Sequence, residues 1–168
     1  DIVRHLCRNG WEAYIAGGAA RDILSGETPS DYDVVTNASY DDVKELFKGR
    51  KLSIVGASFK VCIIDGIEVA TYRKDACFNL TDKNCSIEKA DTIQEDLARR
   101  DLTINAMAYC PYNGNIVDEY GGLSDLKNRI IKFTGNPKDR IHEDPCRILR
   151  ACRFMAKFEG KFDADTLV

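Results

Sequence analysis

The sequence predicts an α/β (α+β) domain with a mixed or antiparallel sheet of about five strands and helices on one side, followed by further helix. Three observations predict this fold class. Short β-type runs alternate with helical patterns over most of the 168 residues. Asp65-Gly66 separates two apolar runs, which is a strong signal for a two-residue hairpin. From Asp144 onward, apolar residues recur mostly every three or four positions, as in an amphipathic helix.

The elements of the first half follow from turn and cap signals. After a helix over residues 2–9 and a strand over residues 12–16, Gly17 and Gly18 are expected to turn the chain into a short helix. That helix should stop at Gly26, because glycine favours the end of a helix and the proline that follows cannot continue it. The next expected elements are a strand over 31–36, a helix over 40–47 capped by Ser39, and strands over 52–55, 59–64 and 67–72.

The second half gives weaker signals. Residues 73–90 are polar and irregular, so they are expected to form a mobile loop. Residues 102–109 are apolar and fit either a helix or a strand. The other expected elements are a helix over 93–99, a strand over 115–118, a turn at Gly121-Gly122, a helix over 124–127, a strand over 130–134, a helical turn at Pro137 and a helix from Asp144.

Composition excludes several classes of protein. Hydrophobic residues make up 44% and charged residues 30%, which is typical of globular domains, and no run of 18 apolar residues could span a membrane. The seven cysteines form no CxxC pair and only two histidines occur, so no zinc-site spacing is present. Reduced thiols in a cytoplasmic protein are the expectation. Because the chain lacks an initiator Met and stops within a helical pattern, we interpret it as a piece of a longer protein.

Charge is distributed unevenly along the chain. The net charge is −3, yet residues 127–161 hold ten Lys or Arg and four Asp or Glu. An acidic front half and a basic tail fit a metal site beside a polyanion site. A solvated basic helix would have the same composition.

Three carboxylates are candidate metal ligands. Asp31 and Asp33 flank Tyr32 on one expected strand, so alternation places both on the same face. Two such charges are costly together unless a cation lies between them, and Mg²⁺ prefers oxygen ligands. Glu68, on another apolar strand, could join them in a two-metal site for phosphoryl or nucleotidyl transfer. It could equally face solvent on an edge strand.

The run Gly17-Gly18-x-x-Arg21 is a candidate phosphate site. Glycines let the backbone approach a ligand, and the start of the following helix offers N–H donors. Arg21 could hold phosphate, or the metal-binding carboxylates, in a bidentate fork. The pattern alone is more typical of a tight turn.

These motifs together resemble those of the class II tRNA nucleotidyltransferases (CCA-adding enzymes) and bacterial poly(A) polymerases, in the DNA polymerase β superfamily. Residues 17–22 followed by Asp31-Tyr32-Asp33 resemble the first motif of this family, and Glu68 occupies its third-carboxylate position. The later motifs follow in the same order. Residues 99–108 resemble RRDxTxNA, residues 118–122 resemble DxxGG, and residues 143–154 resemble EDxxRxxRxxRF.

The resemblance implies a nucleotidyltransferase catalytic head over residues 1–135. Residues 136–168 would be the truncated start of a helical neck that carries the base-selecting helix. It implies Mg²⁺ at Asp31 and Asp33, with Glu68 completing the catalytic acidic triad. The implied nucleotide-binding roles are triphosphate contact by Gly18 and Arg21, ribose contact and ordering of the site by Arg100 and Asp101, and base pairing by Asp144 and Arg147.

The base-selecting role also has a physical interpretation. Asp144 and Arg147 are three apart on the expected helix, so they would face the same way. A carboxylate accepts from an exocyclic amine and a guanidinium donates to the neighbouring acceptor, an edge shared by cytosine and adenine. Arg150 and Arg153 continue this stripe and could reach phosphate. A salt-bridged surface helix is the alternative interpretation.

The implied function is Mg²⁺-dependent, template-independent addition of C and A from CTP and ATP to the 3′-hydroxyl of tRNA, with release of pyrophosphate. A poly(A) polymerase, or an enzyme adding only CC or only A, would share these head motifs. A non-catalytic nucleotide- or RNA-binding relic is a further alternative, which the intact carboxylates disfavour. We expect ATP, CTP and the tRNA 3′ end as partners, no membrane partner and a cytoplasmic location.

Overall fold

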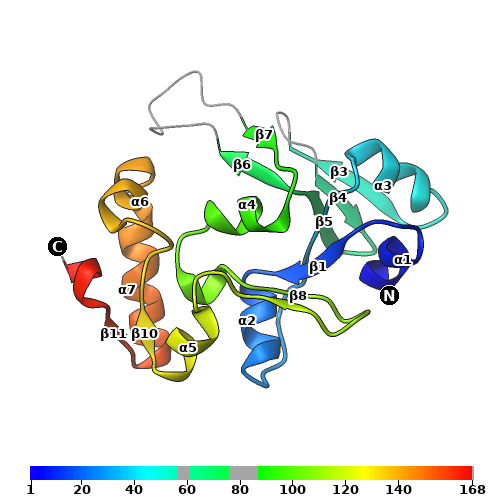
Figure 1. Cartoon of the computed structure of the whole chain (residues 1–168). Coiled ribbons are helices and arrows are strands. Elements are labelled where there is room, and N and C mark those ends of the chain that lie inside the picture. Colours follow the sequence, from blue (N-terminus) through cyan, green and yellow to red (C-terminus); the bar gives the residue numbers. More distant parts are fainter. Residues whose placement is uncertain (57–60, 76–86, 168) are drawn as a thin grey trace.

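A seven-stranded mixed sheet is the centre of the computed structural model, which describes residues 1–56, 61–75 and 87–167 (Figure 1). The strand order is β3-β4-β5-β2-β1-β8-β9, and only the β2–β5 pair is parallel. The strands are β1 Ala13–Ala16, β2 Asp33–Thr36, β3 Leu52–Val55, β4 Val61–Ile64, β5 Ile67–Thr71, β8 Ala108–Tyr109 and β9 Ile116–Val117. The predicted α+β class with a mixed sheet is therefore confirmed. The sheet is wider than about five strands, because β8 and β9 extend it with two residues each.

Helices cover both faces of the sheet, so the prediction of helices on one side is wrong. Helices α1 (Ile2–Arg8), α2 (Gly18–Leu24) and α3 (Tyr40–Leu46) contribute to one core with Val34. Helix α4 (Ile93–Ala98) packs on the opposite face through Ile93 and Leu97, in a core with Val35. Because β2 is buried on both sides, its sequence shows no alternation that could indicate a solvent face.

The local signals at turns and caps are confirmed. Asp65 and Gly66 adopt φ angles of 50° and 87°, as a tight two-residue hairpin requires. Ser39 caps α3: its hydroxyl accepts from Asp42 N, and the Asp42 carboxylate accepts from Ser39 N. The strand expected over 31–36 begins at Asp33, so Asp31 lies in the segment that leads into β2.

The predicted loop over residues 73–90 is structured at both of its ends. Strands β6 (Arg73–Asp75) and β7 (Ile87–Lys89) pair antiparallel there. Residues 76–86 between them lie outside the described residues, as do residues 59–60 at the start of the strand expected over 59–64.

A third hydrophobic cluster joins the C-terminal elements to the middle of the chain. Leu102 and Ile104 pack with Ile131, Ala151 and Phe154. Residues 102–109, which fitted either helix or strand, form the short turn η1 followed by β8. The elements of this part are η1 Thr103–Asn105, α5 Gly122–Lys127, β10 Ile130–Ile131, α6 Pro137–Glu143, α7 Cys146–Phe158, β11 Lys161–Phe162 and η2 Ala164–Leu167.

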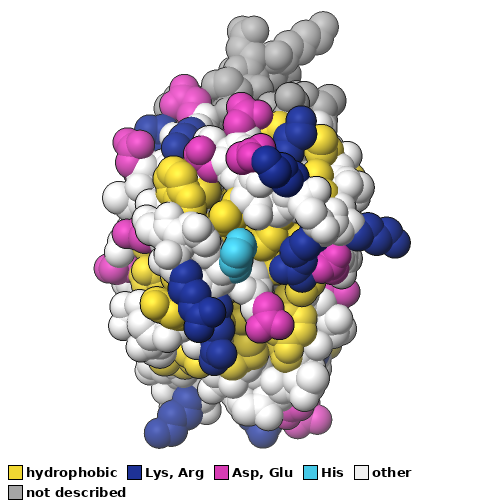
Figure 2. Space-filling view, turned by 90° about the vertical axis from the view of Figure 1, so that its right-hand side faces the viewer, with side chains coloured by type: hydrophobic (Ala, Val, Ile, Leu, Met, Phe, Trp, Pro, Cys, Tyr) yellow, Lys and Arg dark blue, Asp and Glu magenta, His cyan; other side chains and the backbone are white. Residues whose placement is uncertain are grey.

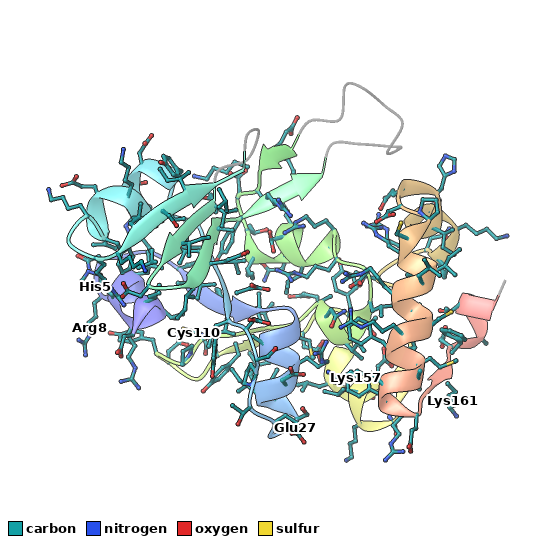
Figure 3. The ribbon with its side chains drawn as sticks, turned by 180° about the vertical axis from the view of Figure 1, so that it is seen from behind. His5, Arg8, Glu27, Cys110, Lys157 and Lys161 are labelled. Carbon is teal, nitrogen blue, oxygen red and sulfur yellow. The ribbon has the colours of Figure 1, made fainter. Side chains whose placement is uncertain are left out.

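The two ends of the molecule are formed by different elements. His5 and Arg8 of α1 lie at one end, and Lys157 and Lys161 lie at the other (Figure 3). Seen from the α1 side, basic and acidic side chains are both spread among hydrophobic ones (Figure 2). No helix among the described residues combines the length and apolar character needed to cross a bilayer.

Close packing at Gly122 holds α5 against η1. The Asp118 carboxylate accepts from Gly122 N at 2.6 Å and from Leu123 N at 3.0 Å, which caps α5. A Cβ on Gly122 would overlap the carbonyl oxygen of Thr103 and lie 2.9 Å from Met107 Cγ. The obstacle is backbone, which cannot move aside cheaply.

We therefore expect Gly122→Ala to lower the free energy of unfolding by about 2 kcal/mol, the usual cost of overpacking a tight contact. The measurement is denaturant unfolding of the variant and the parent. Gly49→Ala is the matched control, because nothing lies within 4 Å of its added Cβ; its effect should stay within about 0.5 kcal/mol. Equal effects of the two substitutions would contradict the packing argument.

Candidate functional site

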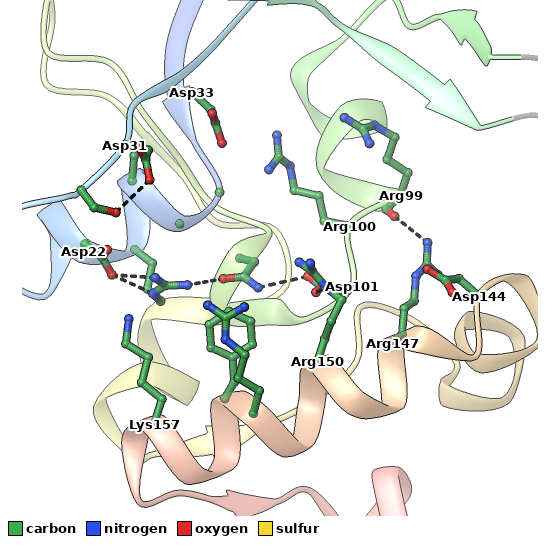
Figure 4. A pocket seen from close by; sticks show the side chains of 18 of the residues that line it. Asp22, Asp31, Asp33, Arg99, Arg100, Asp101, Asp144, Arg147, Arg150 and Lys157 are labelled. Carbon is green, nitrogen blue, oxygen red and sulfur yellow. Dashed lines mark hydrogen bonds and ion pairs between the residues drawn. The ribbon is translucent and has the colours of Figure 1, made fainter. Parts of the chain in front are cut away.

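A pocket of about 630 Å³ lies between α2, the start of β2, the C-terminal end of α4 and α7 (Figure 4). The described residues that line it carry more positive than negative charge. A pocket of this charge suits a polyanionic ligand such as a phosphate chain. Its cationic side chains are Arg21, Arg73, Arg99, Arg100, Arg147, Arg150, Arg153 and Lys157, and its carboxylates are Asp22, Asp31, Asp33, Asp101 and Asp144.

The structure brings nearly all of the predicted site residues into this one pocket. Every residue proposed for the nucleotide lines it, and so do Asp31 and Asp33. Glu68 does not line the pocket. It lies beside Asp33 in the parallel β2–β5 register, so the two carboxylates share one face of the sheet.

Two of the pocket's carboxylates, Asp31 and Asp33, lie at the start of β2. Asp31 precedes the strand, so strand alternation is the wrong reason for its position, yet it reaches the same pocket as Asp33. Asp31 Oδ2 accepts from Ser30 Oγ at 3.0 Å. Within the described ranges, no three Asp, Glu, His or Cys side chains gather closely enough to hold a metal ion by themselves. Mg²⁺ is commonly held by one or two carboxylates together with substrate phosphates, and this donor set fits that mode.

Arg21 is the buried centre of the pocket wall, with 5% of its surface exposed. Its Nη1 donates to Asn105 Oδ1 at 2.6 Å, and its Nε donates to Asp22 Oδ1 at 2.9 Å. Its Cζ lies 5.1 Å from the ring centroid of Phe154 and 5.4 Å from that of Phe158. The guanidinium expected to grip phosphate therefore also joins α2 to η1 and α7.

Asn105 extends this connection to a second buried charge. Its Nδ2 donates to Asp101 Oδ1 at 3.1 Å, and Arg150 Nε donates to Asp101 Oδ2 at 2.6 Å. Because Asn105 accepts from Arg21 and donates to Asp101, only one orientation of its amide satisfies both. A continuous chain, Arg21–Asn105–Asp101–Arg150, thus runs along the wall (Figure 4).

The surroundings of Asp101 determine its protonation. Burial raises its pKa, but this effect is outweighed by the hydrogen bonds from Asn105 and Arg150 and by the positive charge of Arg150. The backbone N–H of Leu102 adds a further hydrogen bond at 2.8 Å. The pKa of Asp101 consequently lies below its usual value, and the carboxylate is ionised at neutral pH.

The helix that was expected to carry both Asp144 and Arg147 does not include Asp144. Asp144 is the C-terminal cap of α6, and its Oδ1 accepts from Cys146 N at 2.9 Å just before α7. Arg147 Nη1 donates to Glu143 Oε2 at 2.5 Å and Arg147 Nη2 donates to the Arg99 carbonyl at 3.2 Å. Both side chains still line the pocket, but a break between two helices, rather than helical spacing, brings them there.

Sequence analysis missed several residues of the site. Asn105 and Asp22 lay inside the motif-bearing runs, and only their contacts with Arg21 show what they do. Lys157 follows Arg153 by one helical turn and lines the same wall of α7, a spacing that could have indicated it. No sequence signal indicated Asp96, a fully buried carboxylate of α4.

Comparison with known proteins identifies similar chains. Residues 13–132 match the family model described as the poly(A) polymerase head domain. Poly(A) polymerase I of Haemophilus influenzae is 38% identical over 95% of this chain and 38% of its own length. The CCA-adding enzyme of Bacillus licheniformis is 36% identical over 98% of this chain and 42% of its own length. The chain thus spans about two fifths of the relatives it matches.

Solved structures give the same picture. The CCA-adding enzyme of Bacillus stearothermophilus in complex with CTP superposes with a TM-score of 0.83 at 34% identity, covering 98% of this chain and 40% of that protein. A tRNA nucleotidyltransferase complexed with a primer tRNA and an incoming ATP analogue gives a TM-score of 0.76 at 32% identity, covering 99% of this chain and 48% of that protein.

The lowered pKa of Asp101 predicts a specific response to acid. A carboxylate with a depressed pKa in the folded state contributes stability that is present above its unfolded pKa and lost as the pH falls through the folded value. Arg150→Met removes a hydrogen bond and a charge that lower this pKa, so its acid unfolding should begin at a higher pH than that of the parent. Circular dichroism between about pH 5 and pH 2 measures this shift.

Lys157→Met provides the matched control for this experiment. It removes one positive charge from the same helix and the same pocket, whereas the contact to Asp101 is made by Arg150. Its acid midpoint should move less than that of Arg150→Met. If the two variants unfold at the same pH, the Arg150 contact does not control the protonation of Asp101.

Proposed function

We propose that this chain, which belongs to the poly(A) polymerase head domain family, is the catalytic head of a metal-dependent nucleotidyltransferase. The observation that carries the proposal is the composition of one pocket. Two carboxylates lie in it at the start of β2, and cationic side chains line it from α2, from the C-terminal end of α4 and from α7. Such an arrangement can hold a nucleoside triphosphate together with the cation that its phosphates require.

We propose Asp31 and Asp33 as the residues that hold Mg²⁺, with Glu68 as their neighbour in the catalytic triad. The ion would activate an RNA 3′-hydroxyl and stabilise charge on the triphosphate. The hydroxyl would attack the α-phosphate, and pyrophosphate would leave. The described carboxylates supply part of the coordination sphere, and the substrate phosphates would complete it.

The cationic side chains would bind different parts of the nucleotide. Gly18 and Arg21 would meet the triphosphate, where the positive charge of Arg21 acts although each of its three nitrogens already has a protein partner. Arg100 would meet the ribose, and Asp101 would order the site through its hydrogen bonds. Arg150 and Arg153, which α7 directs to the same wall, would reach phosphate.

Base selection would fall to Asp144 and Arg147. Both line the pocket where α6 ends and α7 begins. A carboxylate and a guanidinium match the amine and acceptor shared by cytosine and adenine, so the pair would accept CTP and ATP. We further propose that residues 1–135 form the head and residues 136–168 the start of the neck.

The specific reaction we propose is addition of C and A to the 3′ end of tRNA. Asp144 and Arg147 would accept both cytosine and adenine, as this reaction requires, and poly(A) polymerases share the motif that carries them. The alternative is a poly(A) polymerase or an enzyme adding only CC or only A, since relatives of 37–38% identity are named poly(A) polymerase I. A non-catalytic relic is less favoured, because Asp31 and Asp33 remain together in the pocket.

The reaction is tested with the full-length protein and a tRNA that lacks its 3′ CCA. Sequenced products should end in CCA. A run of A, or CC alone, would overturn CCA addition in favour of poly(A) synthesis or partial addition.

Asp33→Asn should abolish both product and pyrophosphate release, because it removes a charged ligand while keeping the shape of the side chain. Asp41→Asn, on exposed α3, is the control and should keep the parent rate. A near-normal rate for Asp33→Asn would exclude the proposed metal site.

Base selection is tested separately from turnover. Asp144→Ala should relax the preference for CTP and ATP over UTP and GTP by about tenfold or more, since unpaired polar groups in a site built on hydrogen bonds penalise the wrong base. Competition assays with all four nucleotides measure this ratio. Asp139→Ala, on the preceding helix α6 and outside the pocket lining, is the control. Unchanged discrimination in Asp144→Ala would mean that the base is recognised elsewhere.

A further inference from the structure

We infer that Asp96, a buried carboxylate of α4, is a positioning residue that orients Arg100 toward the nucleotide. Asp96 is fully buried and is not among the residues that line the pocket. The inference rests on the proposed function, because it concerns how the nucleotide pocket is shaped. It assigns a role to a residue that none of the sequence motifs indicated.

The two oxygens of Asp96 have different partners. Oδ1 accepts from Arg73 N at 3.1 Å, from Arg99 Nε at 3.2 Å and from Arg99 Nη2 at 3.1 Å. Oδ2 accepts from Arg100 Nη2 at 3.1 Å. One oxygen therefore joins the end of α4 to β6, and the other holds Arg100. A buried carboxylate needs such partners, because a buried charge left unpaired is costly.

Arg100 retains donors that the protein does not use. Its Nε is buried and has no hydrogen-bond partner among the residues that the structure describes. Its Nη1 lies 2.6 Å from the position that a Cβ on Gly17 would occupy. Gly17 has a φ of 66°, so glycine serves both the turn and the close approach of this guanidinium. Asp96 thus holds the Nη2 group of Arg100, while the Nη1 group lies at the turn that begins α2 (Figure 4).

The Nη1 group of Arg100, which lies at the Gly17 turn of the pocket, is the edge that a ligand could reach. The pocket into which Arg100 faces is the one proposed for the nucleotide, whose ribose and phosphate oxygens are acceptors. Without Asp96, Arg100 would keep its charge but lose the contact that restricts its rotamers. Binding would then require ordering a long side chain, which weakens affinity.

The two-oxygen geometry makes Asp96→Asn a selective probe. The amide oxygen of Asn can still accept the three hydrogen bonds that Oδ1 accepts from Arg73 and Arg99. The NH₂ group then replaces Oδ2 and faces Arg100 Nη2, so two donors meet and this hydrogen bond is lost. This substitution should release Arg100 while leaving the link to β6 in place. Glu95→Gln is the structural control, because the Glu95 carboxylate accepts from Asp91 N and Thr92 N at the start of the same helix, outside the pocket.

The experiment measures CTP binding by calorimetry, with Mg²⁺, and steady-state kinetics in the full-length protein. Asp96→Asn should bind CTP about tenfold more weakly, with KM raised more than kcat is lowered. Glu95→Gln should leave CTP affinity unchanged, since its amide oxygen can accept the same two backbone hydrogen bonds. Arg100→Gln should weaken binding as well, and adding Asp96→Asn to it should cost nothing further, since the two act as one unit.

The outcomes distinguish a failure of the positioning role from a failure of the proposed function. Additive losses in the double variant, or unchanged CTP affinity in a folded Asp96→Asn protein, would overturn the positioning role while the proposed function stands. Absence of CTP binding by the parent protein would instead contradict the proposed function, and the inference with it. Asp96→Glu keeps the charge, and partial recovery of CTP affinity relative to Asp96→Asn supports the role.

Discussion

The chain of hydrogen bonds from Arg21 through Asn105 and Asp101 to Arg150 is the constraint on which the pocket depends. Its members come from α2, η1 and α7, three segments that are far apart in the sequence. Arg21 is almost completely buried, so the cost of its desolvation must be offset by Asp22, by Asn105 and by the faces of two phenylalanine rings. The Arg150–Asp101 hydrogen bond at 2.6 Å attaches α7 to this chain of contacts, and the Phe154 and Phe158 rings against Arg21 attach the same helix to α2. The pocket exists because these charges are satisfied by one another.

The parallel pairing of β2 with β5 is the second constraint. It places Glu68 beside Asp33, although 34 residues separate them in the chain. Parallel neighbours in a sheet require a crossover, and α3 with the β3–β4 hairpin supplies it here. Asp33 and Glu68 therefore share one face of the sheet although they are far apart in the sequence, and Asp31 reaches the same pocket as Asp33.

Local signals in the sequence predicted the elements well where short-range chemistry decides. The Asp65-Gly66 hairpin and the Ser39 cap are determined by residues next to one another, and both are confirmed. The helix α4 itself was predicted, but the face of the sheet that it covers was not. Because β2 is buried on both faces, its sequence lacks the alternation that would show which face helices cover. The break before α7 was also missed, since Pro145 can stand in the first turn of a helix as well as end one.

The sequence predicted which residues form the site better than it predicted the contacts among them. The motifs indicated Asp31, Asp33 and the arginines of the later part, and the fold gathers them. They did not indicate which charges are satisfied internally. Buried carboxylates, Asp96 and Asp101, hold arginines in fixed orientations, whereas the exposed Asp31 and Asp33 open into the pocket. This difference follows from burial, which is a property of the tertiary structure. A buried carboxylate must be bonded within the protein, whereas the exposed Asp31 and Asp33 remain available to a cation.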